Sequence, residues 1–132
     1  MYKLTVNNNM WYRFDISNDK IKIELLPEKL DNNVYTDIYT PDTYYIYLSK
    51  RYNTLRVEIE VSLKFLDYLS LIRVIHLGFT IQRIDDITNN ILWTLWVAPT
   101  NVDVLNFEKT PENTNMDFNV RLKITGLMGG WM

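Results

Sequence analysis

The stretch LRVEIEVSLKF, from Leu55 to Phe65, alternates strictly between apolar and polar side chains. Successive side chains of a β-strand point to opposite faces of the sheet, so this order places one apolar row on a core and one polar row in water. Antiparallel sheets commonly bury one face and leave the other in solvent. The stretch therefore predicts a half-buried strand of an antiparallel sheet.

The same alternation recurs on both sides of this strand. It runs from Phe118 to Thr125 and, in a shorter form, from Lys20 to Leu25. The polar run Asp85–Asn90 separates two further apolar stretches, Phe79–Ile84 and Ile91–Ala98. Asn and Asp favour turns because they tolerate left-handed backbone and bond to their own backbone, so these stretches predict a hairpin.

The N-terminal part predicts a three-stranded meander. Its strands are Tyr2–Val6, Trp11–Ile16 and Lys20–Leu26, separated by Asn7–Asn9 and Ser17–Asp19. Further strands are expected at Val34–Tyr39, Thr43–Ser49 and, within a polar segment, Val102–Phe107.

The segment from Ser62 to Gly78 allows two structures. Its polar residues Lys64, Asp67, Ser70 and Arg73 recur every third position, as a helix would have them, and Gly78 stands where a helix-ending glycine belongs. The alternative continues the strand through Phe65, turns at residues 67–70 and resumes the strand at Leu71. Short apolar runs do not decide between the two.

The predicted fold class is mainly β, a single antiparallel β-sandwich of jelly-roll type with at most one short helix around residues 63–77. The alternative is an α+β fold. A chain of 132 residues is the size of one domain, so residues 1–132 are expected to form one β-sandwich domain with an apolar C-terminal tail at residues 126–132. Many short strands with frequent turns are typical of sandwiches and barrels.

Composition excludes several kinds of site. The chain has no cysteine, which removes disulfides, thiolate metal sites and cysteine nucleophiles. The net charge is −2 without a basic block, so no nucleic-acid binding through a basic patch is expected. No signal peptide or membrane-spanning segment is recognised, and no cofactor is predicted.

No catalytic or metal-binding residues are predicted. His76 is the only histidine and lies in no nucleophile motif, which favours a structural role. Glu58 with Glu60, and Asp85 with Asp86, are better explained as the wet face of a strand and the start of a turn. The stretch 101–106 has oxygen ligands for calcium without the spacing or glycine of an EF-hand.

Exposed aromatic residues are the candidates for an interface. Tyr44, Tyr45 and Tyr47 lie in a tyrosine-rich stretch, and tyrosine is favoured at interfaces, although it is also a good strand former. In the strand 91–98, Trp93 is expected inward with Ile91, Leu95 and Val97, which places Trp96 on the opposite face.

The C-terminal tail is the other interface candidate. A strand is expected to end near Thr125, followed by Gly126, Leu127, Met128, Gly129, Gly130, Trp131 and Met132. Apolar side chains gain about 1.5–3 kcal/mol each on full burial, so Leu127, Met128, Trp131 and Met132 are expected to dock, either on their own core or on a neighbouring subunit.

These features favour a non-catalytic structural protein that self-associates as a homo-oligomer or binds other structural proteins. A virion component, such as a coat or capsid-associated protein, is the most specific form of this hypothesis. It would be located in the virion; the sequence indicates no other location. The alternative is a carbohydrate- or peptide-binding β-sandwich that uses exposed Tyr and Trp. A small hydrolase with dispersed acidic residues is a third class.

Overall fold

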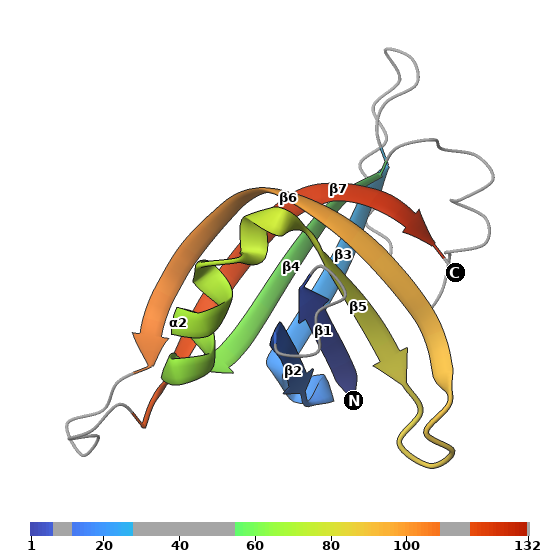
Figure 1. Cartoon of the computed structure of the whole chain (residues 1–132), viewed down its shortest axis with the longest axis horizontal. Helices are drawn as coiled ribbons and strands as arrows, with labels where there is room; N and C mark the ends of the chain where they lie inside the picture. The colour runs from blue at the N-terminus through green and yellow to red at the C-terminus, as the bar shows by residue number, and fades with distance from the viewer. Residues whose placement is uncertain (7–11, 28–54, 109–116, 132) are drawn as a thin grey trace.

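One antiparallel sheet dominates the structure, a computed structural model that describes residues 1–6, 12–27, 55–108 and 117–131 (Figure 1). Its strands are β1 (Tyr2–Val6), β2 (Arg13–Ile16), β3 (Ile21–Pro27), β4 (Leu55–Lys64), β5 (Phe79–Ile84), β6 (Ile91–Glu108) and β7 (Asn119–Trp131). The helical elements are the 3-10 turns η2 (Asn18–Lys20) and η3 (Ile75–Leu77) and the α-helix α2 (Phe65–Ile72). The predicted mainly β class is confirmed.

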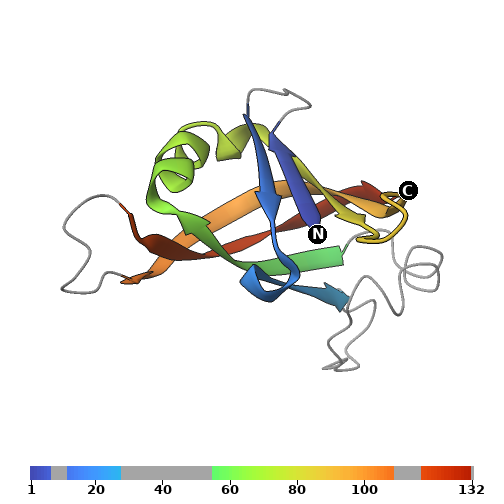
Figure 2. The ribbon, with the colours of Figure 1, turned by 90° about the horizontal axis from the view of Figure 1, so that it is seen from below.

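The seven strands follow the order β2-β1-β5-β6-β7-β4-β3. They form one continuous sheet, so the jelly-roll-like sandwich is not confirmed. The sheet curls until its β2–β1 end faces its β4–β3 end, which Figure 2 shows from below. The curl explains why both ends contribute side chains to a single hydrophobic core.

The core lies inside this curl. The alternating row that begins at Val57 and ends at Leu63 is buried as the sequence predicts. The largest fully buried side chains are Leu4, Leu25, Ile59, Leu71, Ile81, Leu95, Leu122 and Ile124. They come from β1, β3, β4, α2, β5, β6 and β7, so the core joins nearly every element.

β6 and β7 form the corner at which the sheet turns. The pairing of β6 with β7 shifts register between Trp96 and Val97 and again between Pro99 and Asn101. Such bulges bend a strand and increase its twist. Pro99 fits there because β5 ends its pairing at Val97, so that none of the described strands pairs with the next residues of β6 on that side. Opposite Pro99 stands Gly126, and a side chain there would meet the Ala98 carbonyl oxygen at 2.6 Å.

The segment after β4 forms the helix that the sequence allows, and the alternative turn at residues 67–70 is not formed. The strand runs to Lys64, and α2 then closes one end of the core with Leu71 fully buried. The Phe65 N–H donates to the Phe118 carbonyl at 2.9 Å, which ties the start of the helix to β7. Gly78 follows η3 with a φ of 89°, a conformation that favours glycine.

The predicted N-terminal meander is wrong. β1 pairs with β2 as expected, but β3 pairs with β4 and leaves β2 at the far edge of the sheet. In this register Ile23 lies beside Ile59 and Leu25 beside Val57, which buries the apolar row of β3. Pairing with β4 therefore outweighs the proximity of β2 along the chain.

The predicted end of the last strand near Thr125 is also wrong. β7 continues to Trp131, and its backbone pairs with β6 as far as Leu95 opposite Trp131. The hairpin predicted around residues 85–90 is confirmed by the pairing of β5 with β6. The strands predicted at 34–39 and 43–49 lie outside the described residues. Within the described ranges, no helix has the length and apolar character to cross a membrane.

Candidate functional site

The predicted interface residues fall into three groups. Tyr44, Tyr45, Tyr47 and Met132 lie outside the described residues. Met128 and Trp131 have their backbone in β7, opposite Val97 and Leu95 of β6, and their side chains are not described. Two of the predicted side chains, Trp96 and Leu127, are described.

Trp96 and Leu127 are partly exposed. Their exposed fractions are 37% and 38%. Trp93, Leu95 and Val97 are buried and Trp96 is partly exposed, as predicted, but Thr94 between them is buried as well. Ile91, expected inward, is exposed, so that prediction is wrong. Ile91 lies at the start of β6, where the pairing with β5 shifts register next to Ile84, and the shift takes it out of the buried row.

The outer face of β3, β4 and β7 is polar and internally paired. Arg121 reaches Glu60 at 2.9 Å and Lys123 reaches Glu58 at 3.7 Å, across the β4–β7 pairing. The Glu24 carboxylate accepts a hydrogen bond from Lys22 and raises the pKa of that ammonium above its ordinary value. Each glutamate of the pair Glu58 and Glu60 therefore faces a cation on β7, which suits a solvated surface.

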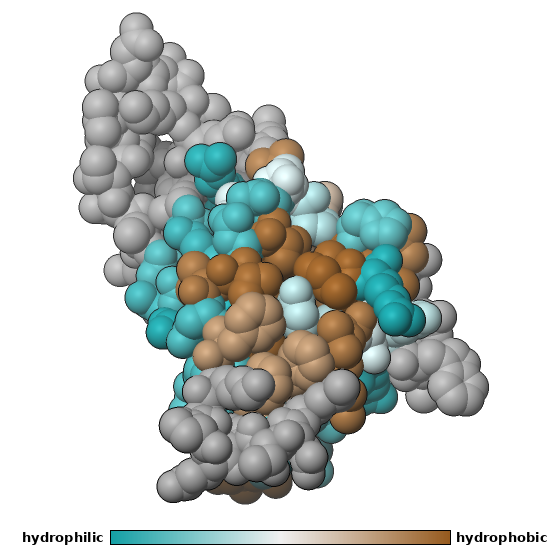
Figure 3. All heavy atoms as spheres, turned by 90° about the vertical axis from the view of Figure 1, so that its left-hand side faces the viewer, coloured by the Kyte–Doolittle hydropathy of each residue, from teal (hydrophilic) through white to brown (hydrophobic). Residues whose placement is uncertain are grey.

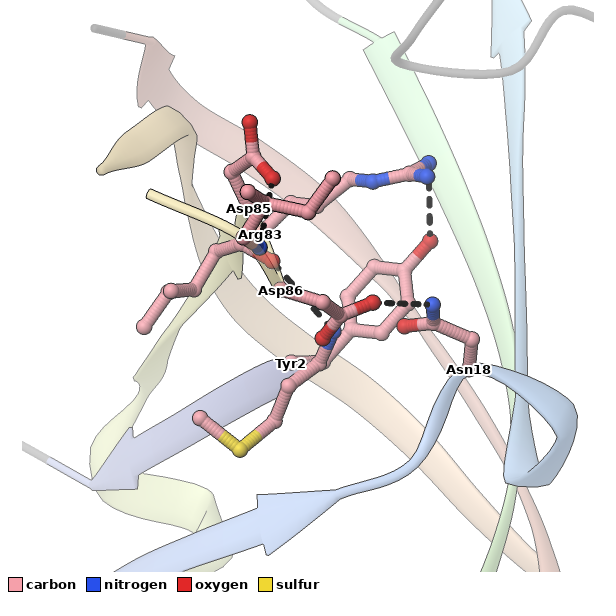
Figure 4. Close-up of polar contacts among 8 residues, drawn as sticks. Tyr2, Asn18, Arg83, Asp85 and Asp86 are labelled. Carbon is pink, nitrogen blue, oxygen red and sulfur yellow. Dashed lines mark hydrogen bonds and ion pairs between the residues drawn. The ribbon is translucent and has the colours of Figure 1, made fainter. Parts of the chain in front are cut away.

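The acidic turn residues Asp85 and Asp86 have structural contacts (Figure 4). The Asp85 carboxylate accepts the Ile87 N–H at 2.9 Å and so closes the β5–β6 turn. Asp86 lies 2.8 Å from the Met1 ammonium and accepts a hydrogen bond from the Asn18 side chain at 3.2 Å. The hydrogen bond from the ammonium holds the pKa of Asp86 below its ordinary value. The two acids thus stabilise the turn and join it to β1 and η2.

The residues considered for calcium do not gather into a site. The Asn101 amide donates to the Asp103 carboxylate at 3.0 Å, so one oxygen of that carboxylate already has a neighbouring partner. Among the described residues, no three or more His, Asp or Glu side chains are grouped as a metal ion would require.

The most distinctive surface is the free β6 edge, which we define as Ala98–Glu108. β5 pairs with β6 only as far as Val97, whereas β7 pairs with β6 along its length to Glu108. Beyond Val97 the edge of β6 that faces away from β7 has no strand beside it within the described part of the chain. A long open edge presents backbone N–H and C=O groups to which another strand can bind.

Apolar side chains line this edge. Val104, Leu105 and Phe107, which we call the apolar rim, are 40%, 45% and 51% exposed. Leu122 lies opposite Val104 and Val120 lies opposite Phe107, and both of these β7 residues are fully buried. The rim is therefore the outermost row of the core, and it is only partly covered.

Aromatic residues of α2 hold one end of the rim. Tyr68 packs edge-on against Phe107 with 6.3 Å between ring centroids, and Phe107 packs in the same way on Phe118. Phe118 in turn stacks on Phe65 at 4.8 Å. Hydrophobic side chains gather in the middle of the face that carries α2 and the adjacent ends of β6 and β7 (Figure 3). Packed aromatic side chains from α2, with Phe118 just before β7, therefore support one end of the exposed rim.

Comparison with protein families, with curated proteins and with solved structures finds no match for this chain. The sequence pattern did not predict the free β6 edge. The available signal was the apolar bulk of Val104, Leu105 and Phe107 within an otherwise polar segment. The position of this segment at an open edge follows from the pairing of distant strands.

Proposed function

We propose that this chain is a non-catalytic structural protein that self-associates. The observation that supports this function is the apolar rim on the free β6 edge. Open strand edges bind other strands, and exposed apolar surface favours burial against a partner. Both properties lie on the same stretch of β6, so one contact would satisfy the backbone groups and cover the apolar row.

A virion component, such as a coat or capsid-associated protein, is the more specific form of this proposal. Compact β domains recur as building blocks of protein shells, which supports this form by analogy at the level of fold. A polar, ion-paired outer face beside an apolar edge is consistent with a subunit that contacts its neighbours along its edges.

Leu105→Lys tests the proposed self-association. Leu105 is 45% exposed and lies at a register shift of the β6–β7 pairing, so the substitution leaves that pairing in place. A charge in the interface would have to be desolvated, and we expect the dissociation constant of the oligomer to rise at least about tenfold. Light scattering coupled to size-exclusion chromatography over a concentration series measures this change.

Ile87→Lys is the matched control. Ile87 is 93% exposed at the tip of the β5–β6 hairpin, away from the free β6 edge, so the same new charge should leave the oligomer intact. A wild-type chain that stays monomeric at high micromolar concentration would contradict the proposed function. An equal loss of oligomer in both variants would contradict the role of the edge.

A further inference from the structure

The free β6 edge has a mirror-symmetric order of side chains. From Asn101 to Glu108 the sequence NVDVLNFE has polar, apolar, polar, apolar and then apolar, polar, apolar, polar residues. The centre of this pattern lies between Val104 and Leu105. An antiparallel pair of identical strands about a twofold axis brings such a pattern opposite itself, with polar beside polar and apolar beside apolar.

The pairing with β7 shows that the pattern is carried by two separate faces. Val102, Val104 and Phe107 stand opposite the buried residues Ile124, Leu122 and Val120. The polar residues Asn101, Asp103, Asn106 and Glu108 stand opposite Thr125, Lys123, Arg121 and Asn119 on the outer face. Because the register shifts between Val104 and Asn106, Asp103 and Asn106 both lie on the outer face, although they are three residues apart.

We propose that two copies of this chain pair through their free β6 edges, antiparallel about a twofold axis between Val104 and Leu105. Asp103 then lies opposite the partner's Asn106, and Asn101 opposite the partner's Glu108. Val102 lies opposite the partner's Phe107, and the apolar rims of both copies join. This inference rests on the proposed self-association and specifies its surface and register.

Among the registers in which two copies could pair, charge favours this one. The edge carries Asp103 and Glu108 and no cation, so any register that brings these acids together is disfavoured. Asp103 would face the partner's Asp103 if the axis passed through that residue, and it would face the partner's Glu108 if the strands shifted by two residues. In the proposed register each carboxylate instead faces an amide, which can donate a hydrogen bond to it.

The existing contacts of the two acids are compatible with this arrangement. Asp103 accepts a hydrogen bond from Asn101 through one oxygen, and Glu108 accepts one from Ser62 at 3.4 Å through one oxygen. A carboxylate has two acceptor oxygens, so each retains one for the partner's amide. On the other side of β6, Lys123 of β7 lies opposite Asp103. In the extended sheet this carboxylate would therefore have a cation on one side and the partner's amide on the other.

Disulfide trapping tests the register directly, because the natural chain has no cysteine. We mix full-length Asp103→Cys with full-length Asn106→Cys, oxidise the mixture and quantify the mixed dimer by mass spectrometry. Residues directly opposite in an antiparallel pair have Cβ atoms about 4.5–5.5 Å apart, close to the separation that a disulfide needs. In this mixed dimer the Asp103→Cys copy keeps its natural Asn106, and the Asn106→Cys copy keeps its natural Asp103. These two residues face each other in the second, symmetry-related contact, which is therefore unchanged.

A mixture of Asn101→Cys with Asp103→Cys is the control. The proposed register separates these positions by five residues, about 16 Å along the strand. We expect at least ten times more mixed disulfide from the first mixture than from the control, with both sets of variants folded by circular dichroism.

The outcomes separate this inference from the proposed function. Preferential trapping of 103 with 106 supports the register. An oligomer without this preference overturns the β6 pairing and leaves the proposed self-association in place. A chain that is monomeric at high micromolar concentration overturns both.

Discussion

Replacement of Ile59 by Ala is expected to lower the free energy of unfolding by about 2–5 kcal/mol, the range for large-to-small changes at buried aliphatic positions. Ile59 is fully buried in β4 and lies between Ile23 of β3 and Ile124 of β7. The removed atoms leave a cavity among three strands of a sheet, and a hydrogen-bonded sheet can collapse only partly around it. Urea unfolding followed by circular dichroism measures the loss.

Ile87→Ala is the control for this prediction. The same atoms are removed from a side chain that is 93% exposed, so the change should stay within about 0.5 kcal/mol. If Ile59→Ala and Ile87→Ala gave the same stability, the result would contradict the burial of the row Val57–Leu63 in the core.

Gly126→Ala is expected to lower the free energy of unfolding by about 1–3 kcal/mol, the usual cost of overpacking. The added Cβ would lie 2.6 Å from the Ala98 carbonyl oxygen, 2.9 Å from the Val97 side chain and 3.0 Å from the Pro99 Cα. Two of these three atoms belong to the backbone, so relief requires β6 and β7 to separate at the corner of the sheet. Urea unfolding measures the stability of this variant as well.

Thr125→Ala is the control within the same strand. Its side chain is on the opposite face of β7 from Gly126, and we expect a cost of about 1 kcal/mol or less. The double variant Val97→Ala with Gly126→Ala sharpens the test. It removes the side-chain contact and leaves the Ala98 oxygen, so it should not restore stability. Full rescue would show that the corner is limited by side-chain packing and that the backbone approach is unimportant.

Both predictions connect the core to the proposed contact. The corner at Gly126 directs β6 beyond the end of β5, and this extension creates the free β6 edge. A variant that opens the corner would therefore affect stability and self-association together. Leu105→Lys, by contrast, should affect self-association alone.

Local sequence patterns predicted where the strands lie more accurately than which strands pair with each other. The alternation in Leu55–Phe65 identified β4 and its buried row, and the polar run 85–90 identified the β5–β6 hairpin. Both depend on contacts close along the chain or on the strict period of two in a strand. The meander failed because β3 pairs with β4, a strand distant along the chain, and buries its apolar row there.

The end of the last strand was misplaced for a related reason. The strand was expected to end before the glycines at 126, 129 and 130, because glycine weakens a strand that is considered alone. At position 126 the missing side chain instead permits close approach of β6. From the sequence alone, glycine therefore predicts the end of a strand. In the fold, the glycine at position 126 instead lets two strands pack closely.

The sequence by itself determined that this chain forms amphipathic strands, because the direction of side chains along a strand depends only on local geometry. It also determined the absence of thiol chemistry and the mirror order of residues 101–108. Only the tertiary structure decided that this mirror lies on a β6 edge beside which the described residues place no strand, and that the edge carries a partly exposed apolar row. That result depends on β5 ending at Val97 while β7 continues, a pairing of distant segments that no local pattern specifies.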